Sequence, residues 1–343
     1  MDISVLGLPQ SGKSTFLKSL IKFNDSQELP EICTLKINDD RLKEVGKLLG
    51  HNKLSYPEIS FKEVNILSIK NNKTTELKEI ESIQNSYGLL LVIRCFENNH
   101  SNQILSDIDE IITELIFSDT IIIENIIERR KNNTKGKTKQ ELENINGEIQ
   151  LLETLKLHLE QGQPLNSYTL PETELKKLFG YNLITLKPIF VLLNYDQDRS
   201  IIESNGDITK IKNKYCYPAK LEMELSELSE NESEEFRQSL NIEPRQDYKV
   251  LKSLFKAMGK IIFITAGEQE IKGWEINKGD NSLIAASKIH SDISKGFIRA
   301  EVIEYNTFIE LGSWNNCKKE GKVKGNGKEY IVNDGDIINF LHS

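Results

Sequence analysis

Residues 7–15, GLPQSGKST, constrain the fold of this 343-residue chain more than any other stretch. They follow a short apolar run at residues 3–6 and precede the apolar positions Phe16, Leu17 and Leu20 of an expected helix. The stretch matches the pattern G-x-x-x-x-G-K-[ST] in the strand-to-helix context that this pattern requires. It therefore predicts an α/β protein whose first strand turns sharply into its first helix.

The chemistry of this pattern is the binding of phosphate groups. Glycines such as Gly7 and Gly12 allow a loop to turn its amides inward around phosphate oxygens, because no Cβ stands in the way. Lys13 is predicted to neutralise the β and γ phosphates, and the Ser14 hydroxyl to bind Mg²⁺. The helix that follows adds its positive N-terminal end. A glycine turn with a purely structural role is the alternative.

Selection of the base is expected at the polar end of a later strand, VLLNYDQD. A guanine-specific site places a carboxylate three residues after asparagine, because guanine presents two donors. Counted from Asn194, that position holds Gln197, whose amide offers one donor and one acceptor, as adenine requires. The sequence therefore favours adenine, with Asp196 or Asp198 as carboxylates that could substitute. In the run CYPAKL, Ala219 and Lys220 are candidates to cover the base.

Residues for hydrolysis are not evident in the sequence. Phosphate-sensing switch proteins carry D-x-x-G at the end of a neighbouring strand, where the aspartate organises Mg²⁺ through water. No such pattern follows the strand expected at residues 58–64. Glu63 could hold the magnesium water, but no catalytic residue that would position an attacking water is identified.

The apolar pattern divides the chain into three kinds of structure. Strand-like runs alternate with helical or polar segments, which indicates a parallel sheet flanked by helices. Apolar residues then recur at intervals of three and four on both sides of a polar loop, which predicts an antiparallel coiled-coil hairpin ended by Gly162 and Pro164. The expected strands are 3–6, 58–64, 89–94 and 189–194, and the hairpin helices span 104–126 and 142–159 around the loop 132–138.

The C-terminal part is β-rich and is predicted to form a small separate domain. Before it, the acidic stretch 222–235 is expected to be a solvated face. The expected C-terminal strands are 261–265, 273–276, 297–302, 329–332 and 337–341, with a turn at 333–336 joining the last two. The expected domains are a discontinuous α/β domain (1–100 and 181–260), a helical arm (101–180) and the β-rich domain (261–343).

Composition and charge narrow the environment and the partners. The net charge is −8, so contact with RNA must be local, and no DNA partner is expected. Four scattered cysteines without zinc spacing indicate reduced thiols, and no apolar run is long enough to span a bilayer. We expect a cytoplasmic monomer without a membrane partner. A small basic patch for RNA phosphates, or else scattered surface cations, is expected at Lys288, His290, Lys295 and Arg299.

Together these motifs resemble the YchF family of Obg-like ATPases over nearly the whole chain. The resemblance implies a P-loop G domain interrupted by a coiled-coil arm and followed by a TGS domain of β-grasp form. It also implies ATP in preference to GTP, Mg²⁺ as cofactor, and a ribosome or RNA as partner. The motifs that carry it are the glycine loop, ICT, DRL, RCFE, NYDQ, PAKLEMEL, FITAGEQEIKGWEINKG and KIHSDISKGFIRAEVIEY.

Site residues follow from the resemblance position by position. It implies that residues 10–15 wrap the phosphates, that Ser14 and Thr34 ligate Mg²⁺, and that Tyr195 meets the adenine. The nucleotide-binding residues expected from all these arguments are Gln10, Ser11, Gly12, Lys13, Ser14, Thr15, Asn194, Tyr195, Gln197, Ala219 and Lys220.

The chain also departs from the family pattern. The family's D-I-A-G-L-V and the glycine-rich loop after it are absent, its N-x-x-E is N-x-x-Q, and its S-A-K is P-A-K at Pro218. These changes spare binding and undercut cleavage, so hydrolysis is expected to be slow, absent or dependent on a partner. The alternatives are a nucleotide-binding interaction module without turnover and a GTP-preferring GTPase. A metabolic kinase is disfavoured, because no second substrate site is found.

Overall fold

The chain folds into two compact units, which are described separately. Unit 1 comprises Met1–Cys33 and Ser60–Asp247, and unit 2 comprises Thr34–Ile59 and Tyr248–Ser343. Residues 34–59 and 248–260 thus group with the C-terminal residues, whereas the sequence had placed them in the α/β domain. The expected three-domain division stays a prediction. The computed structural model describes residues 1–21, 29–65, 74–96, 101–196, 200–239, 242, 246–267 and 270–343.

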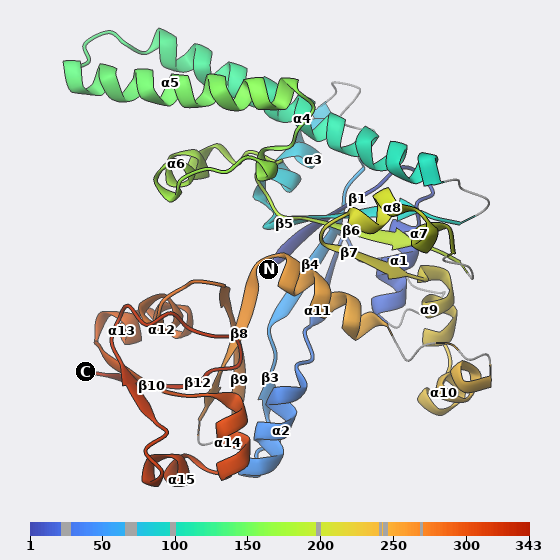
Figure 1. The fold of residues 1–343 in the computed structure, drawn as a ribbon, viewed down its shortest axis with the longest axis vertical. Helices are drawn as coiled ribbons and strands as arrows, with labels where there is room; N and C mark the ends of the chain where they lie inside the picture. The colour runs from blue at the N-terminus through green and yellow to red at the C-terminus, as the bar shows by residue number, and fades with distance from the viewer. Residues whose placement is uncertain are drawn as a thin grey trace. The chain divides into compact units, whose positions relative to one another are not determined.

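The first sheet has the strand order β2-β4-β1-β5-β6-β7 (Figure 1). Its strands from β4 to β7 run parallel, so their carboxyl ends meet at one edge. All four strands expected for this part are present, whereas β2 and β7 were not expected. Along the chain, β2 and β4 each cross from one unit into the other. The strands are β1 (Asp2–Leu6), β2 (Ile32–Lys36), β4 (Glu58–Glu63), β5 (Gly88–Arg94), β6 (Ile189–Asn194) and β7 (Lys214–Tyr217).

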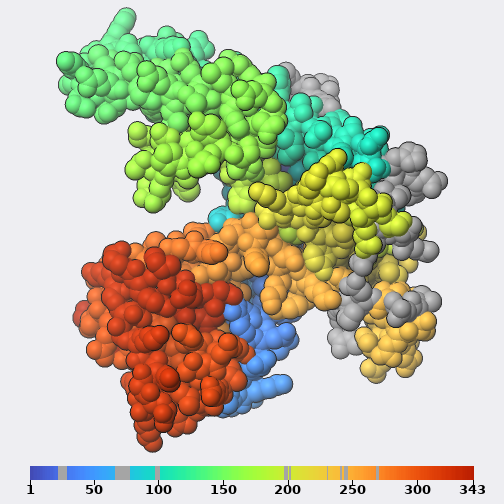
Figure 2. Space-filling model, viewed as in Figure 1, coloured from blue at the N-terminus to red at the C-terminus, as the bar shows by residue number. Residues whose placement is uncertain are grey.

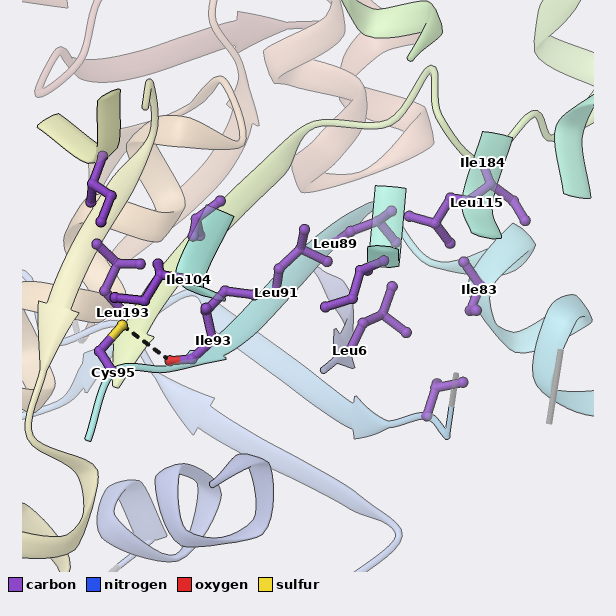
Figure 3. Packing of buried hydrophobic residues seen from close by; sticks show 14 of the residues in the cluster. Leu6, Ile83, Leu89, Leu91, Ile93, Cys95, Ile104, Leu115, Ile184 and Leu193 are labelled. Atoms are coloured by element: carbon purple, nitrogen blue, oxygen red, sulfur yellow. Dashed lines mark hydrogen bonds between the residues drawn. The ribbon is translucent and has the colours of Figure 1, made fainter. Parts of the chain in front are cut away.

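Strand β5 lies at the centre of the unit 1 core. Its run GLLLVIR is apolar up to the final arginine, as is usual for a parallel strand that is buried on both faces. Alternate residues Leu89, Leu91 and Ile93 lie on one face of the strand, where they pack with Leu115 and Leu193 in the cluster of Figure 3. This packing fixes the carboxyl ends of the strands in a rigid frame.

The predicted helical hairpin is confirmed, and α4 (Ser101–Asn132) and α5 (Lys139–Glu160) lie side by side (Figures 1 and 2). Thr138 and Glu141 form a capping box at the start of α5. The expectation that the whole stripe of α4 forms the hairpin seam was wrong. The first half of α4, including Ile104, belongs to the core of the sheet, and only the later residues, including Ile123, pack with α5.

A buried carboxylate fastens the chain where it returns from the hairpin. Asp119 of α4 accepts hydrogen bonds from the amides of Ile184 and Thr185, both at 2.7 Å, and from the Thr185 hydroxyl at 2.6 Å. Burial raises the pKa of Asp119, and these hydrogen bonds oppose the shift. Nothing in the periodic pattern distinguished Asp119 from the solvated acidic residues of the helix.

The acidic stretch 222–235 is not a fully solvated face as expected. Glu222 on α9 (Ala219–Ser226) forms an ion pair of 2.6 Å with Arg237 on α10 (Glu230–Ser239), and both side chains are nearly inaccessible. The prediction failed because an ion pair allows a charged side chain to be buried. The other helices of unit 1 are α1 (Lys13–Ile21), α3 (Thr74–Asn85), α6 (Glu172–Leu178), α7 (Ser200–Ser204) and α8 (Gly206–Lys210).

Unit 2 contains a mixed sheet with the order β11-β10-β12-β8-β9-β3. The antiparallel pair β8–β9 is followed by α12, and β12 returns parallel to β8, which is the β-grasp arrangement. The strand expected at residues 329–332 is absent; only an isolated bridge at Ile331 occurs there. The strands are β3 (Leu54–Ser55), β8 (Lys260–Ala266), β9 (Ile271–Asn277), β10 (Phe297–Ile303), β11 (Lys324–Asn326) and β12 (Ile337–His342).

Residues 34–59 are built into this second fold. Strand β3 extends the sheet beside β9, and Arg41 of α2 is bound to Asp334 by two hydrogen bonds of 3.0 and 3.1 Å. Tyr305 donates a hydrogen bond of 2.5 Å to Glu44. The helices are α2 (Asp40–Leu49), α11 (Asp247–Ala257), α12 (Ser282–Ile289), α13 (Ser291–Lys295), α14 (Tyr305–Leu311) and α15 (Trp314–Lys319). None of the described helices is long and apolar enough to cross a membrane.

Candidate functional site

A cavity of about 490 Å³ opens at the carboxyl edge of the first sheet. Residues at or just after the carboxyl ends of β1, β4, β5 and β6 converge there with two residues of α9, as is general for open parallel sheets. The residues that line it are Gln10, Gly12, Lys13, Ser14 and Thr15 after β1, Glu63 at the end of β4, Phe96 after β5, Asn194, Tyr195 and Asp196 at the end of β6, and Lys220 and Met223 on α9.

The glycine loop has the backbone that the motif requires. Gly12 adopts a φ of +92°, and a Cβ at this residue would collide with the Asn194 side chain. A Cβ at Gly7 would come within 2.6 Å of the Val92 carbonyl oxygen. Helix α1 begins at Lys13, so its first amides are directed to the cavity end of the helix. The loop is therefore a close-packed cradle that only glycine permits at these two positions.

The lysine of the motif lies at the cavity rim. Its ammonium donates hydrogen bonds to the carbonyl oxygens of Gly7 and Leu8, at 3.0 and 3.2 Å. Burial lowers the pKa of Lys13, while the nearby carboxylate of Glu63, at 3.9 Å, opposes this shift. A partly desolvated ammonium of this kind is well suited to pair with phosphate oxygens.

Glu63 approaches the loop as the sequence suggested. Its Oε2 accepts a hydrogen bond of 2.8 Å from the Ser14 hydroxyl. A carboxylate and a hydroxyl oxygen side by side at a phosphate site are the hard donors that Mg²⁺ prefers, with the phosphates and water completing the shell. Ser14 and Glu63 therefore fit a magnesium ion. Thr34, the other expected ligand, belongs to unit 2, and its role stays a prediction.

Asn194 connects the glycine loop with the start of α9. Its amide nitrogen donates to the Ser11 carbonyl oxygen at 3.0 Å, and its amide oxygen accepts from the Ala219 amide at 3.1 Å. Both polar atoms of this buried side chain are thus used by the protein. Asn194 also lines the cavity, so its expected role in nucleotide binding stays a prediction, and its two hydrogen bonds position the loop and the start of α9.

Most of the described residues expected at the site are brought together, but Ser11 and Ala219 are not. Both residues are buried, and within the described part of the chain the Ser11 hydroxyl has no hydrogen-bond partner. Gln197, on which the adenine argument depends, lies outside the described residues. Asp196 does line the cavity, so a carboxylate that could accept from guanine is present.

Phe96 and Met223 were not predicted as site residues. Together with Tyr195 they give the cavity an apolar part suited to a flat base. The Arg94 guanidinium lies over the Phe96 ring, 5.0 Å from its centre. Met223 could have been inferred, because it lies three residues after Lys220 on the same helix face. Phe96 carried a weaker signal, namely an aromatic residue just past a strand end.

The sheet, the glycine loop and the helix that starts inside it define unit 1 as a member of the P-loop class of α/β proteins. Comparison with known proteins gives the family: the chain belongs to the YchF family. It is 32% identical to the "Ribosome-binding ATPase YchF" of Buchnera aphidicola subsp. Acyrthosiphon pisum, over 98% of each chain, and 29% identical to that of Bacillus subtilis, over 99% of this chain and 98% of the relative.

Two further comparisons concern the domains and the fold. Residues 261–343 match the family YchF-GTPase_C, described as "Protein of unknown function (DUF933)". The solved structure of the Schizosaccharomyces pombe YchF GTPase superposes with a TM-score of 0.81 at 23% identity, over 99% of this chain and 97% of that one. This likeness supports the α/β architecture that the sequence predicted.

Proposed function

We propose that this protein binds ATP with Mg²⁺ in the unit 1 cavity and associates with ribosomes, with weak or partner-dependent hydrolysis. The observation that carries the proposal is the convergence of Lys13, Ser14 and Glu63 on one cavity at the glycine loop. The curated relatives are named ribosome-binding ATPases, which supports both the nucleotide and the partner.

The residues divide the work of binding. The loop amides and Lys13 would neutralise the phosphates, and Phe96 with Met223 would enclose the base. Ser14 and Glu63 would hold Mg²⁺, which when bound would offset the phosphate charge. Asn194 holds the glycine loop and the start of α9 at a fixed distance through its two hydrogen bonds. The phosphate end and the base end of the cavity would therefore stay at a fixed separation.

Turnover is proposed to be weak because the sequence carries no recognisable motif for positioning an attacking water. Glu63 is held by Ser14, and the D-x-x-G pattern of switch proteins is absent from the sequence. A partner that supplies the missing group would allow hydrolysis, as occurs when a stabilising residue is provided in trans. A GTP preference is the second candidate, favoured by the position of Asp196 in the cavity wall and by the name of the fission yeast relative.

Calorimetric titration with ATP and with GTP in the presence of Mg²⁺, followed by phosphate release with and without ribosomes, tests the proposal. We expect ATP to bind at least about tenfold more tightly than GTP, a difference of about 1.4 kcal/mol. Lys13→Ala should abolish binding, because the cavity loses its partly buried cation.

Lys210→Ala is the matched control, since it removes an exposed lysine of the same unit that pairs with Asp207 away from the cavity. Tighter binding of GTP, lost in Asp196→Asn, would replace ATP by GTP in the proposal. Unchanged ATP binding by Lys13→Ala would refute it altogether.

A further inference from the structure

Residues 318–328, here called the basic segment, are a local concentration of positive charge on an acidic protein. Their sequence KKEGKVKGNGK contains five lysines and one glutamate, whereas the whole chain has a net charge of −8. All five lysines are exposed. A polyanion that approaches this protein would therefore be attracted to this segment and repelled by much of the remaining surface.

The segment runs from the end of α15 through β11, in unit 2. Strand β11 is the first in the sheet order and pairs with β10 alone, so its other edge is not covered by a strand of this sheet. In Figures 1 and 2, α15 lies at the lower end of the red part of the chain. The segment thus presents its lysines from a helix end and from a sheet edge that are adjacent in the chain.

Three of the five lysines have no acidic partner among the described residues. Lys319, Lys322 and Lys328 make no ion pair there, while Lys318 lies 3.5 Å from Glu301 and Lys324 lies 3.8 Å from Glu304. The pair of Lys324 with Glu304 is largely exposed, so solvent screens it. Most of the charge of the segment is therefore available to a ligand.

The basic patch expected from the sequence, at Lys288, His290, Lys295 and Arg299, differs from the basic segment because its side chains lie next to carboxylates. Lys288 lies 3.4 Å from Glu275, and both His290 and Lys295 lie within 4.0 Å of Asp292. Lys288 and Lys295 are thus each paired with a carboxylate, and His290 shares Asp292 with Lys295. Arg299 also pairs with a carboxylate, that of Glu301, at 3.0 Å.

Two structural roles account for part of the basic segment. Lysines in the last turn of a helix complement its dipole, which explains Lys318 and Lys319, and lysines on an edge strand prevent unwanted strand pairing, which explains Lys324. Neither role requires Lys322 or Lys328, which lie outside α15 and β11. A ligand that contacts all five lysines of the basic segment would account for Lys322 and Lys328 as well.

We propose that the basic segment binds the phosphate backbone of double-stranded RNA, and that it is the surface through which this protein meets ribosomal RNA. Lysines act as point charges for phosphates and carry no base readout, which fits a duplex contacted through its backbone. Single-stranded RNA would need aromatic platforms, and the segment has none. The nearby Trp314 lies against Phe308, with ring centres 6.5 Å apart.

This inference rests on the proposed association with ribosomes, so its test uses two probes and two matched variants of the full-length protein. The probes are purified 70S ribosomes, in co-sedimentation, and a fluorescein-labelled RNA duplex, in anisotropy titrations at several salt concentrations. The test variant is Lys319→Gln/Lys322→Gln/Lys328→Gln. The control variant Lys278→Gln/Lys288→Gln/Lys295→Gln removes the same charge from the same unit, at exposed lysines outside the segment.

We expect the test variant to bind the duplex about 10- to 100-fold more weakly at 0.1 M salt, with a salt slope smaller by about 2 to 3, and to lose most ribosome co-sedimentation. The control variant should bind both probes as the parent does. An unchanged slope in the test variant, or equal losses in both variants, would overturn the inference and leave the proposed function intact.

The remaining outcomes separate the two proposals. If the parent protein binds neither probe, the proposed ribosome association fails and the inference falls with it. Loss of ribosome binding by the test variant without any loss of duplex binding would assign the segment to an acidic ribosomal protein and would refute the RNA assignment. ATP binding by both variants, measured in parallel, shows that unit 1 is intact.

Discussion

At the scale of single residues, Glu63 decides how the cavity responds to a metal ion. Its carboxylate lies beside the Ser14 hydroxyl at 2.8 Å and near the Lys13 ammonium at 3.9 Å. A carboxylate next to a phosphate site repels the phosphates unless a cation lies between them. The same residue should therefore hinder nucleotide binding without Mg²⁺ and favour it with Mg²⁺.

Glu63→Gln should separate these two effects. In EDTA the variant should bind ATP several-fold more tightly than the parent, because the repulsive charge is gone while the amide can still bond to Ser14. The gain in affinity on adding Mg²⁺ should shrink by about tenfold, because a hard anionic ligand is lost. Titration calorimetry with and without Mg²⁺ measures both quantities.

Glu153→Gln, on the exposed surface of the hairpin, is the control for the change in net charge. It should behave as the parent does in both buffers. A Glu63→Gln variant that retains the full stimulation by Mg²⁺ would show that this carboxylate takes no part in holding the ion.

Residues of the site differed in how well the sequence predicted them. Lys13, Ser14 and Glu63 were predicted because a local motif or a strand end marks them. The contacts by which Asn194 positions the loop were not predicted, because they depend on two partners, Ser11 and Ala219, that are distant in the sequence. Phe96 was not predicted for a related reason. The sequence pattern of an apolar residue just past a strand end is the same whether the residue lines a cavity or packs in a core.

At the scale of elements, the attachment of α10 to α9 depends on one buried ion pair. Arg237→Met would leave the Glu222 carboxylate buried without a counter-charge, which costs about 3 kcal/mol or more. We expect the free energy of unfolding of unit 1, followed by far-UV circular dichroism in urea, to fall by this amount. The double variant Glu222→Gln/Arg237→Met should recover part of the loss.

An exposed pair on another helix gives the matched comparison. Lys176→Met breaks the pair of Lys176 with Glu172 on α6, whose side chains are both about three-quarters exposed or more. That loss should be at most about 1 kcal/mol, because solvent screens the pair. Similar small losses in both variants would contradict a structural role for the buried pair.

The long elements were predictable and the short ones were not. The hairpin helices were predicted within a few residues, because apolar periodicity over many turns is a strong signal. Strand β11, three residues with two polar side chains, was missed, and a strand was predicted at 329–332 instead. A short edge strand is specified by the partner beside it, here β10, more than by its own pattern.

At the scale of the whole molecule, two units with separate cores should respond separately to nucleotide. Both tryptophans, Trp274 and Trp314, lie in unit 2, whereas the candidate site lies in unit 1. ATP at a hundred times its dissociation constant should stabilise unit 1 by about 2.7 kcal/mol. We expect the far-UV transition of unit 1 to shift by more than the tryptophan fluorescence transition in urea.

Lys13→Ala provides the control, since ATP should then shift neither transition. Equal shifts of the two signals in the parent protein would mean that the units unfold as one cooperative body. The sequence could not settle this point, because the residues that group with the C-terminal fold include 34–59, which lie between two strands of the first sheet.

Helix α4 begins five residues after Phe96, which lines the cavity, and continues without interruption to the tip of the hairpin. At 1.5 Å per residue, its 32 residues make a rod about 48 Å long. Ile104 and Leu115 are seated in the core, so a tilt of about 5° about Leu115 would move the far end, about 25 Å away, by about 2 Å. A small shift of the start of α4, caused by a nucleotide in the cavity, would thus become a displacement of the hairpin tip. Such a displacement would change the contacts of the tip with a neighbouring macromolecule.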